Sequence, residues 1–323
     1  MPEPQTPPPS ATLPLLCVVI PVFNEEPVLP ELLERLQRVL GNLTTVRWEV
    51  VFVDDGSRDR TAAMLNEAAV LEPRFQLVRL SRNFGHQPAL TAGLAQAGLA
   101  DAVVTMDADL QDPPELIPEL VAAWQGGAEV VLAVRRSRQD AGLRRVGFDV
   151  FHRWFQRVSD FKIEANTGTF GLLARPAVAA INGLEERHRF FPGLRAWVGF
   201  KQAEVFYDRQ ERAAGTPAQT LRRLVRYALD GIFSFSYFPL RLTTYLGLFI
   251  AGLGFAVGTF FVVRRLLGQE VAFTGFTTLV TLVLFLGGVQ LIGIGILGEY
   301  LGRIYDEAKR RPLYVLRPPE SKS

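Results

Sequence analysis

Short runs of β-branched residues alternate with amphipathic stretches between positions 15 and 134. Residues 18–20 and 50–53 are strand-like runs, and each is followed by apolar residues at helical spacing, over 31–40 and 61–70. Such alternation predicts an α/β fold, with a doubly wound, mostly parallel sheet covered by helices on both faces. Further strands are expected at 75–80, 102–105 and 130–134, with helices at 89–99 and 116–124.

Two long runs, Thr243 to Val263 and Gly275 to Leu297, contain no charged residue. Each has at least the roughly 20 residues that a helix needs to cross a bilayer. The alternative is a pair of helices buried in a globular core, but such helices rarely stay uncharged on every face for this length. We therefore expect two transmembrane helices. Their glycines would let helices approach closely, as in a homo-oligomer.

Basic residues flank these runs on the side of both chain ends. They are Arg222, Arg223, Arg226 and Arg241 before the first run, and Arg303, Lys309, Arg310, Arg311 and Arg317 after the second. Positive charge collects on the cytoplasmic side of membrane proteins, so both termini are expected in the cytoplasm, at the inner membrane. Arg264 and Arg265 in the short connection weaken this expectation without reversing it.

The remaining segments complete the expected organisation. Aromatic and basic stretches at 148–161 and 221–242 are candidates for helices in the membrane interface, with ordinary core packing as the alternative. The first residues are rich in proline and lack a signal-peptide pattern. We expect a disordered tail at 1–12, a globular α/β domain at 13–219, interfacial juxtamembrane helices at 220–242, two transmembrane helices at 243–298 and a cytoplasmic tail at 299–323.

Two aspartates follow the strand expected at 102–105. Asp107 and Asp109 would face the same side if the pleat continued, and Gln111 would offer an amide oxygen there again. Such oxygen ligands suit Mg²⁺ or Mn²⁺ bound together with substrate phosphates. The alternative is an acidic turn that caps the next helix, since residues 112–115 read Asp-Pro-Pro-Glu. That alternative accounts for Asp112 and leaves Asp107 and Asp109 unexplained.

Two more polar clusters follow strands, at residues 21–26 (Pro-Val-Phe-Asn-Glu-Glu) and 54–57 (Asp-Asp-Gly-Ser). Ligands of doubly wound sheets bind beyond the carboxyl ends of strands, so three clusters there favour a binding site. A helix start at Glu26 and an ordinary turn at 55–57 are the alternatives. No Gly-x-Gly-x-x-Gly follows the first strand and no Gly-Lys-Ser/Thr loop occurs, which argues against a dinucleotide oxidoreductase and a P-loop NTPase.

Composition adds little to this picture. The net charge of the 323 residues is only +2, and we expect no nucleic-acid partner. The single cysteine, Cys17, lies in an apolar strand-like run, so no disulfide can form within the chain and a buried thiol is expected.

Four ordered motifs carry a family resemblance. Residues 21–25 (Pro-Val-Phe-Asn-Glu), 53–57 (Val-Asp-Asp-Gly-Ser), 81–85 (Ser-Arg-Asn-Phe-Gly) and 107–115 (Asp-Ala-Asp-Leu-Gln-Asp-Pro-Pro-Glu) resemble the pattern of glycosyltransferase family 2. With the two apolar runs, the chain is most similar to the polyprenyl-phosphate glycosyltransferases of that family. The resemblance implies a GT-A fold and an enzyme that takes a sugar from a nucleotide to a lipid phosphate.

The resemblance also implies roles for particular residues. The nucleotide pocket would be lined by Pro21, Phe23, Glu25, Asp54 and Asp55, and Mg²⁺ or Mn²⁺ would be held by Asp107, Asp109 and Gln111. Arg135 would contact phosphate, although Arg136 competes for that role and a surface arginine is the alternative. The acceptor phosphate would meet Arg222, Arg223 and Arg226 near the membrane.

The expected reaction is inverting transfer of a hexose to polyprenyl (undecaprenyl) phosphate among the membrane lipids. UDP-glucose is the expected donor and GDP-mannose the alternative. A processive polysaccharide synthase would carry a Gln-x-x-Arg-Trp segment and more spans. A membrane protein that only binds nucleotide sugars is the third alternative, because Thr169 and Ala218 stand where many relatives have a carboxylate and a lysine; Arg187, His188 or Arg189 could compensate.

Overall fold

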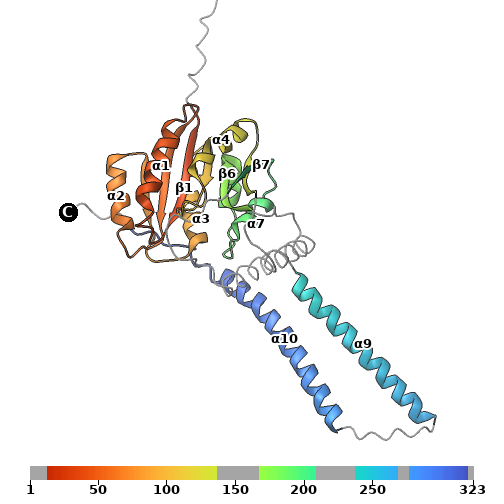
Figure 1. The fold of residues 1–323 in the computed structure, drawn as a ribbon. Helices are drawn as coiled ribbons and strands as arrows, with labels where there is room; N and C mark the ends of the chain where they lie inside the picture. Colours follow the sequence, from red (N-terminus) through yellow and green to blue (C-terminus); the bar gives the residue numbers. More distant parts are fainter. Residues whose placement is uncertain (1–12, 137–166, 209–236, 268–275, 319–323) are drawn as a thin grey trace, which may run out of the picture. The chain divides into compact units, whose positions relative to one another are not determined.

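The computed structural model describes residues 13–136, 167–208, 237–267 and 276–318 (Figure 1). They belong to two compact units, an α/β domain and a pair of long apolar helices. The segment that follows the second long helix, from Pro312 onward, belongs to the α/β domain. The stretches predicted at 1–12 and 148–161 lie outside the described residues, as do residues 220–236 of the interfacial stretch predicted at 220–242.

The α/β domain contains a seven-stranded sheet in the order β3-β2-β1-β4-β6-β5-β7. Neighbouring strands are parallel except around β6, which runs antiparallel to β4 and β5. The mostly parallel sheet predicted from the sequence is confirmed. The strands are β1 (Leu15–Val22), β2 (Arg47–Asp54), β3 (Phe75–Arg79), β4 (Ala102–Thr105), β5 (Val130–Arg135), β6 (Thr167–Ala174) and β7 (Gln202–Tyr207).

Helices cover both faces of this sheet, as the pattern predicted. Alternate residues of β1 point to opposite faces: Ile20 joins the core beneath α1 and α4, while Val19 joins the core beneath α3, α6 and α7. The helices are α1 (Leu29–Gly41), α2 (Thr61–Leu71), α3 (His86–Gln96), the short 3-10 turn η1 (Pro114–Leu116), α4 (Ile117–Gln125), α6 (Arg175–Asn182) and α7 (Phe191–Trp197).

Helix α3 lies unusually close to the sheet. A Cβ atom at Gly93 would stand 2.2 Å from Cγ1 of Val19 and 3.1 Å from Cγ2 of Val53. Glycine is therefore required for this helix to approach β1 and β2. Cys17 is buried in the same core, as expected, and burial followed by the nearby Glu49 carboxylate raises the pKa of its thiol.

The second unit consists of α9 (Phe238–Leu266) and α10 (Phe276–Ala308). Within the segments Phe238–Arg264 and Thr281–Ala308, an 18-residue stretch has a mean hydropathy of 2.3 and 2.1, respectively, and both helices are long and apolar enough to cross a membrane. Their large side chains face outward; Phe255, for example, is 79% exposed. An apolar surface of this size is unsuited to water and suits a lipid environment.

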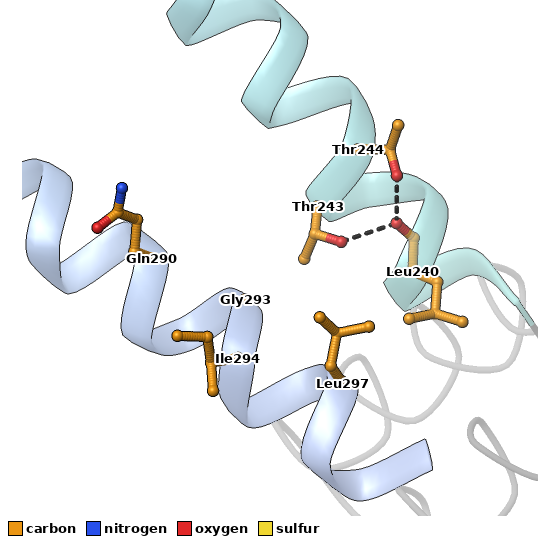
Figure 2. Close-up of a pocket in the computed structure, with 7 residues that line it drawn as sticks. All are labelled: Leu240, Thr243, Thr244, Gln290, Gly293, Ile294 and Leu297. Carbon is orange, nitrogen blue, oxygen red and sulfur yellow. Dashed lines mark hydrogen bonds between the residues drawn. The ribbon is translucent and has the colours of Figure 1, made fainter. Parts of the chain in front are cut away.

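The two helices leave a groove of about 470 Å³ between them, shown in Figure 2. Thr243 and Thr244 of α9 both donate their hydroxyl hydrogens to the carbonyl oxygen of Leu240, while Gln290 and Gly293 line the groove from α10. At every glycine of α9 and α10, an added Cβ would meet no described atom within 4 Å. The close helix approach expected from these glycines is therefore not made between α9 and α10.

We predict that Gly93→Ala destabilises the α/β domain by about 1–3 kcal/mol, because the new methyl group overpacks the interface with Val19. Gly41→Ala in α1 is the matched control, since its Cβ would enter open space. The midpoint of chemical denaturation of the purified protein measures both. Equal stability of the two variants would show that α3 can move away from the sheet at little cost.

Candidate active site

Parallel pairing brings the three predicted clusters to one edge of the sheet. Val22, the last residue of β1, pairs with Asp54 at the end of β2, and Val19 pairs with Thr105 at the end of β4. The loops that follow these strands therefore begin side by side, as expected for the ligand-binding edge of a doubly wound sheet. This confirms the convergence predicted from the sequence.

The loops after β1 and β2 are joined by hydrogen bonds. The backbone N–H of Asn24 donates to Oγ of Ser57 at 3.0 Å, and the N–H of Arg58 donates to Oδ1 of Asn24 at 2.8 Å. The N–H of Glu25 donates to Oγ1 of Thr61 at 2.9 Å. Asn24 has a φ of 55°, a left-handed conformation that asparagine tolerates better than most residues. These bonds fix the backbone that directly follows Phe23.

Phe23 is the first exposed residue after β1. Its side chain is 40% exposed, whereas Pro21 is buried within β1 and Glu25 is half-buried. An exposed aromatic ring on a fixed loop provides a flat apolar face to which a nucleobase can stack. The geometry is compatible with the role that the resemblance implied for Phe23.

The two adjacent aspartates at the end of β2, Asp54 and Asp55, are buried and accept hydrogen bonds from backbone N–H groups. Oδ1 of Asp54 accepts a hydrogen bond from the N–H of Ser57 at 2.8 Å, and its Oδ2 lies 3.5 Å from Nε of Arg79. Asp55 accepts from the N–H of Phe84 at 2.7 Å and from that of Gly85 at 2.9 Å. Burial raises the pKa of Asp55, and the two backbone N–H groups partly oppose it. Their contact with nucleotide stays a prediction.

Asp55 thus ties the loop at 81–85 to the turn at 54–57. The two backbones also touch directly, since a Cβ at Gly56 would stand 2.6 Å from the carbonyl carbon of Arg82. Gly56 has a φ of +74°, so glycine is required here for both conformation and space. Two of the four sequence motifs therefore form a single structural unit.

Asp107 lies at the centre of the candidate site. Its Oδ1 accepts a hydrogen bond from Oγ1 of Thr169 at 3.1 Å and lies 2.9 Å from Nε2 of His86. Burial would raise the pKa of Asp107, but the charge and hydrogen bond of His86, the Thr169 hydroxyl and the more distant Arg135 outweigh burial and lower it. The side chain of Asp107 is 36% exposed, so this ionised carboxylate can still meet a ligand.

The backbone turns sharply between Asp109 and Gln111. Leu110 is buried and has a φ of 59°, which costs a non-glycine residue roughly 1–2 kcal/mol. The N–H of Gln111 donates to Oδ1 of Asp109 at 3.1 Å. The buried leucine side chain therefore anchors a strained turn that presents Asp109 and Gln111 after Asp107.

The oxygen chemistry of this cluster suits a divalent ion that is shared with a substrate. Among the described residues, no group of three His, Cys, Asp or Glu side chains is arranged to hold a metal ion. Mg²⁺ is usually bound through one or two carboxylates plus substrate phosphates, a pattern that Asp107, Asp109 and the Gln111 amide can satisfy. A metal ion would therefore fit these residues only together with oxygen ligands from a bound phosphate.

A second network fixes Arg135. The hydroxyl of Tyr207 donates to Oδ1 of Asp112 at 2.5 Å and accepts from Nε of Arg135 at 3.0 Å. Nη2 of Arg135 lies 3.6 Å from Oδ1 of Asp112. Burial, then the charge of Asp107, raises the pKa of Asp112 to about 6, against the opposing effects of Arg135 and Tyr207. In contrast, Arg136 forms an exposed ion pair with Asp208, so Arg135 is the arginine held within the site.

The helix-cap interpretation of Asp112 was wrong. The turn that begins at Pro114 has Pro113 at its N-cap and no side-chain cap hydrogen bond. Asp112 is instead fully buried against Tyr207, which lies 95 positions later in the chain. A strand pattern at 202–207 is the only sequence signal that could have pointed to Tyr207.

The structure brings together several residues that sequence reasoning did not assign. His86 directly follows the motif at 81–85, and this position was a signal that the sequence offered. Thr169 was noted only because many relatives have a carboxylate there.

Arg189, which the sequence analysis offered as a compensating residue, donates from Nη1 and Nη2 to the carbonyl oxygens of Leu184 and Ile181, both at 2.7 Å, at the end of α6. Its guanidinium therefore stabilises the backbone at the end of α6. Arg222, Arg223, Arg226 and Ala218 lie outside the described residues.

We predict that Tyr207→Phe lowers the unfolding free energy by about 1–3 kcal/mol, because Asp112 loses its buried donor. Asp112→Asn should also destabilise the domain, and the double variant should lose less than the sum of the two by about 0.5–3 kcal/mol. Chemical denaturation of the four proteins measures this coupling. Tyr245→Phe, at an exposed position of α9, is the control. Simple additivity would contradict the network.

Comparison with known proteins gives matches over both units. The model of "Glycosyl transferase family 2" matches residues 17–181, and that of "GtrB C-terminal hairpin" matches residues 238–304. The "Bactoprenol glucosyl transferase" of Shigella phage SfV is 44% identical over 309 residues, which cover 95% of this chain and 99% of that protein. The "Uncharacterized glycosyltransferase sll0501" of Synechocystis sp. is 45% identical, over 93% of this chain and 94% of its own.

A solved structure of lower similarity also covers most of the chain. "Mannosyltransferase PcManGT from Pyrobaculum calidifontis in complex with GDP-Man and Mn2+" is 17% identical, over 90% of this chain and 89% of its own, with a TM-score of 0.42. The sequence matches are much stronger and extend nearly from end to end. Together with the mostly parallel α/β sheet and the pair of apolar helices, they show that this chain belongs to glycosyltransferase family 2.

Proposed function

We propose that this enzyme transfers glucose from UDP-glucose to polyprenyl phosphate at the cytoplasmic face of the inner membrane. One combination carries the proposal: the same chain has Asp107 and Asp109 at the carboxyl edge of its sheet and two helices long enough to cross a membrane. The first suits a nucleoside diphosphate and the second suits a lipid acceptor. The names of the bactoprenol glucosyl transferases, 44% identical to this chain, support the same acceptor and sugar.

Residues at the strand ends would bind the donor. Phe23 offers its exposed ring to the base. Asp107, Asp109 and Gln111 would hold Mg²⁺ or Mn²⁺ against the diphosphate, and the ion would neutralise charge on the leaving group. Arg135, oriented by Tyr207, would add a fixed positive charge close to the same phosphates.

A lipid phosphate acceptor reduces the need for a general base in the protein. A lipid monophosphate has a second pKa near 6, so at neutral pH it is largely a dianion and needs no strong general base. Thr169 is compatible with this, because its hydroxyl donates to Asp107 and it carries no basic group. Direct attack by a phosphate oxygen on the anomeric carbon expels the nucleoside diphosphate and inverts the configuration of that carbon.

We predict that purified protein transfers radiolabelled glucose from UDP-glucose to undecaprenyl phosphate, that EDTA stops the reaction, and that Mg²⁺ or Mn²⁺ restores it. A panel of UDP- and GDP-sugars tests the donor. A mannolipid from GDP-mannose would replace glucose in the proposal. Nucleotide-sugar binding without any product would favour a protein that only binds its ligand.

Asp109→Ala should reduce transfer by at least about 100-fold, because the phosphate-binding edge loses one of its oxygen ligands. The protein should still be folded and membrane-bound. Glu34→Ala is the control, since Glu34 is an exposed carboxylate of α1 that pairs only with Arg38 among the described residues. Normal turnover in Asp109→Ala would remove Asp109 from the proposed metal site.

Membrane orientation can be tested with single cysteines. The native Cys17 is buried and should react little with a maleimide. With a membrane-impermeant maleimide, Gln269→Cys between the two apolar helices should label in intact spheroplasts. Ser321→Cys near the C-terminus should label only after lysis. The reverse pattern would place the catalytic domain on the outer side.

A further inference from the structure

The end of the chain lies on the edge of the α/β sheet. The N–H of Ser81 donates to the carbonyl oxygen of Val315, and the N–H of Arg317 donates to that of Arg79, each at 2.8 Å. These bonds flank an antiparallel bridge between Leu80 and Leu316. Strand β3 is the outermost strand at this side of the described sheet. The C-terminal segment, defined here as Leu313–Arg317, therefore covers the carboxyl end of this edge strand.

This contact occurs where the candidate site begins. Leu80 is followed at once by the loop at 81–85, whose far end donates two backbone hydrogen bonds to Asp55. His86 comes next and contacts Asp107. The loop is therefore held at its start by the C-terminal segment and at its end by Asp55.

One side chain of the segment adds to the backbone contacts. Tyr314 is half-buried and packs against the same core cluster as Phe84 and Val78. Val315 and Leu316, by contrast, are 47% and 51% exposed. The segment is thus attached mainly by its backbone and by Tyr314, which packs against the same core cluster as Phe84 of the loop at 81–85.

We propose that the C-terminal segment is a positioning element for the active-site loop at 81–86. It sets the backbone that holds Asp55 and aligns His86 with Asp107, and it does not itself touch the substrate. Residues 309–312 connect it directly to α10, so one short piece of chain joins a membrane-length helix to the catalytic edge. This inference deepens the proposed function and rests on it for its catalytic consequence.

A pair of substitutions at one residue isolates the backbone contact. Arg317→Pro removes the N–H that donates to Arg79, while the proline still allows the extended conformation of Leu316. Arg317→Ala removes the same side chain and keeps the N–H. Both are made in the full-length protein.

The first readout is amide hydrogen exchange. Arg317→Pro should raise exchange at Phe84 and Gly85 by about tenfold, a factor expected from losing about one backbone hydrogen bond, while β1 stays protected. Arg317→Ala should match the wild type. Unchanged exchange at 81–86 in Arg317→Pro, or an equal rise throughout the sheet, would overturn the proposal, because the segment would then be inert or merely stabilising.

The second readout is steady-state transfer. Arg317→Pro should lower kcat/KM for the sugar nucleotide by about 10- to 100-fold, a loss typical of a misplaced site, with Arg317→Ala near the wild-type value. Full activity of Arg317→Pro would contradict a positioning role. If the wild-type protein transferred no sugar at all, the proposed function would fail, and the exchange measurement would still decide whether the segment positions the loop.

Discussion

Parallel pairing of β1 with β2 and β4 is the constraint on which the candidate site depends. Backbone hydrogen bonds fix the register, so the loops after these strands must leave the sheet side by side. Residues distant in sequence then meet without any special long-range recognition: Asn24 bonds to Ser57, and Asp55 bonds to Phe84. Gly93 allows α3 to lie close to the sheet. His86, in the first turn of α3, contacts Asp107.

The aspartates at this edge have different structural tasks. Asp54 and Asp55 are buried and bind backbone N–H groups, so their charge is largely used to hold loops together. Asp107 remains partly exposed, and His86 and Thr169 favour its ionised form. Asp112 is buried with a raised pKa against Tyr207 and Arg135. Aspartates that look alike in the sequence are thus structural where they are buried and accessible to a ligand where they are partly exposed.

Sequence periodicity predicted the first five strands, the helices between them and the two apolar helices, because both depend on local patterns. It also predicted that the polar clusters would converge, which follows from parallel topology. The pairing of Tyr207 with Asp112 could not be predicted, since β7 reaches the sheet only through tertiary packing beside β5. The return of Leu316 to β3 has the same character: nothing near residue 316 encodes its partner 236 positions earlier.

The position of Thr169 shows how the chemistry of the acceptor decides whether a site needs a general base. For an alcohol acceptor, a missing carboxylate would matter because a proton must be removed as the bond forms. A lipid phosphate arrives already ionised, so under the proposed function the position can serve another purpose. Here the hydroxyl of Thr169 donates to Asp107, while the carbonyl oxygen of Thr169 accepts from Thr105 at the end of β4. The residue therefore links the Asp107 carboxylate to the sheet, so this position stabilises Asp107 and does not supply a proton acceptor.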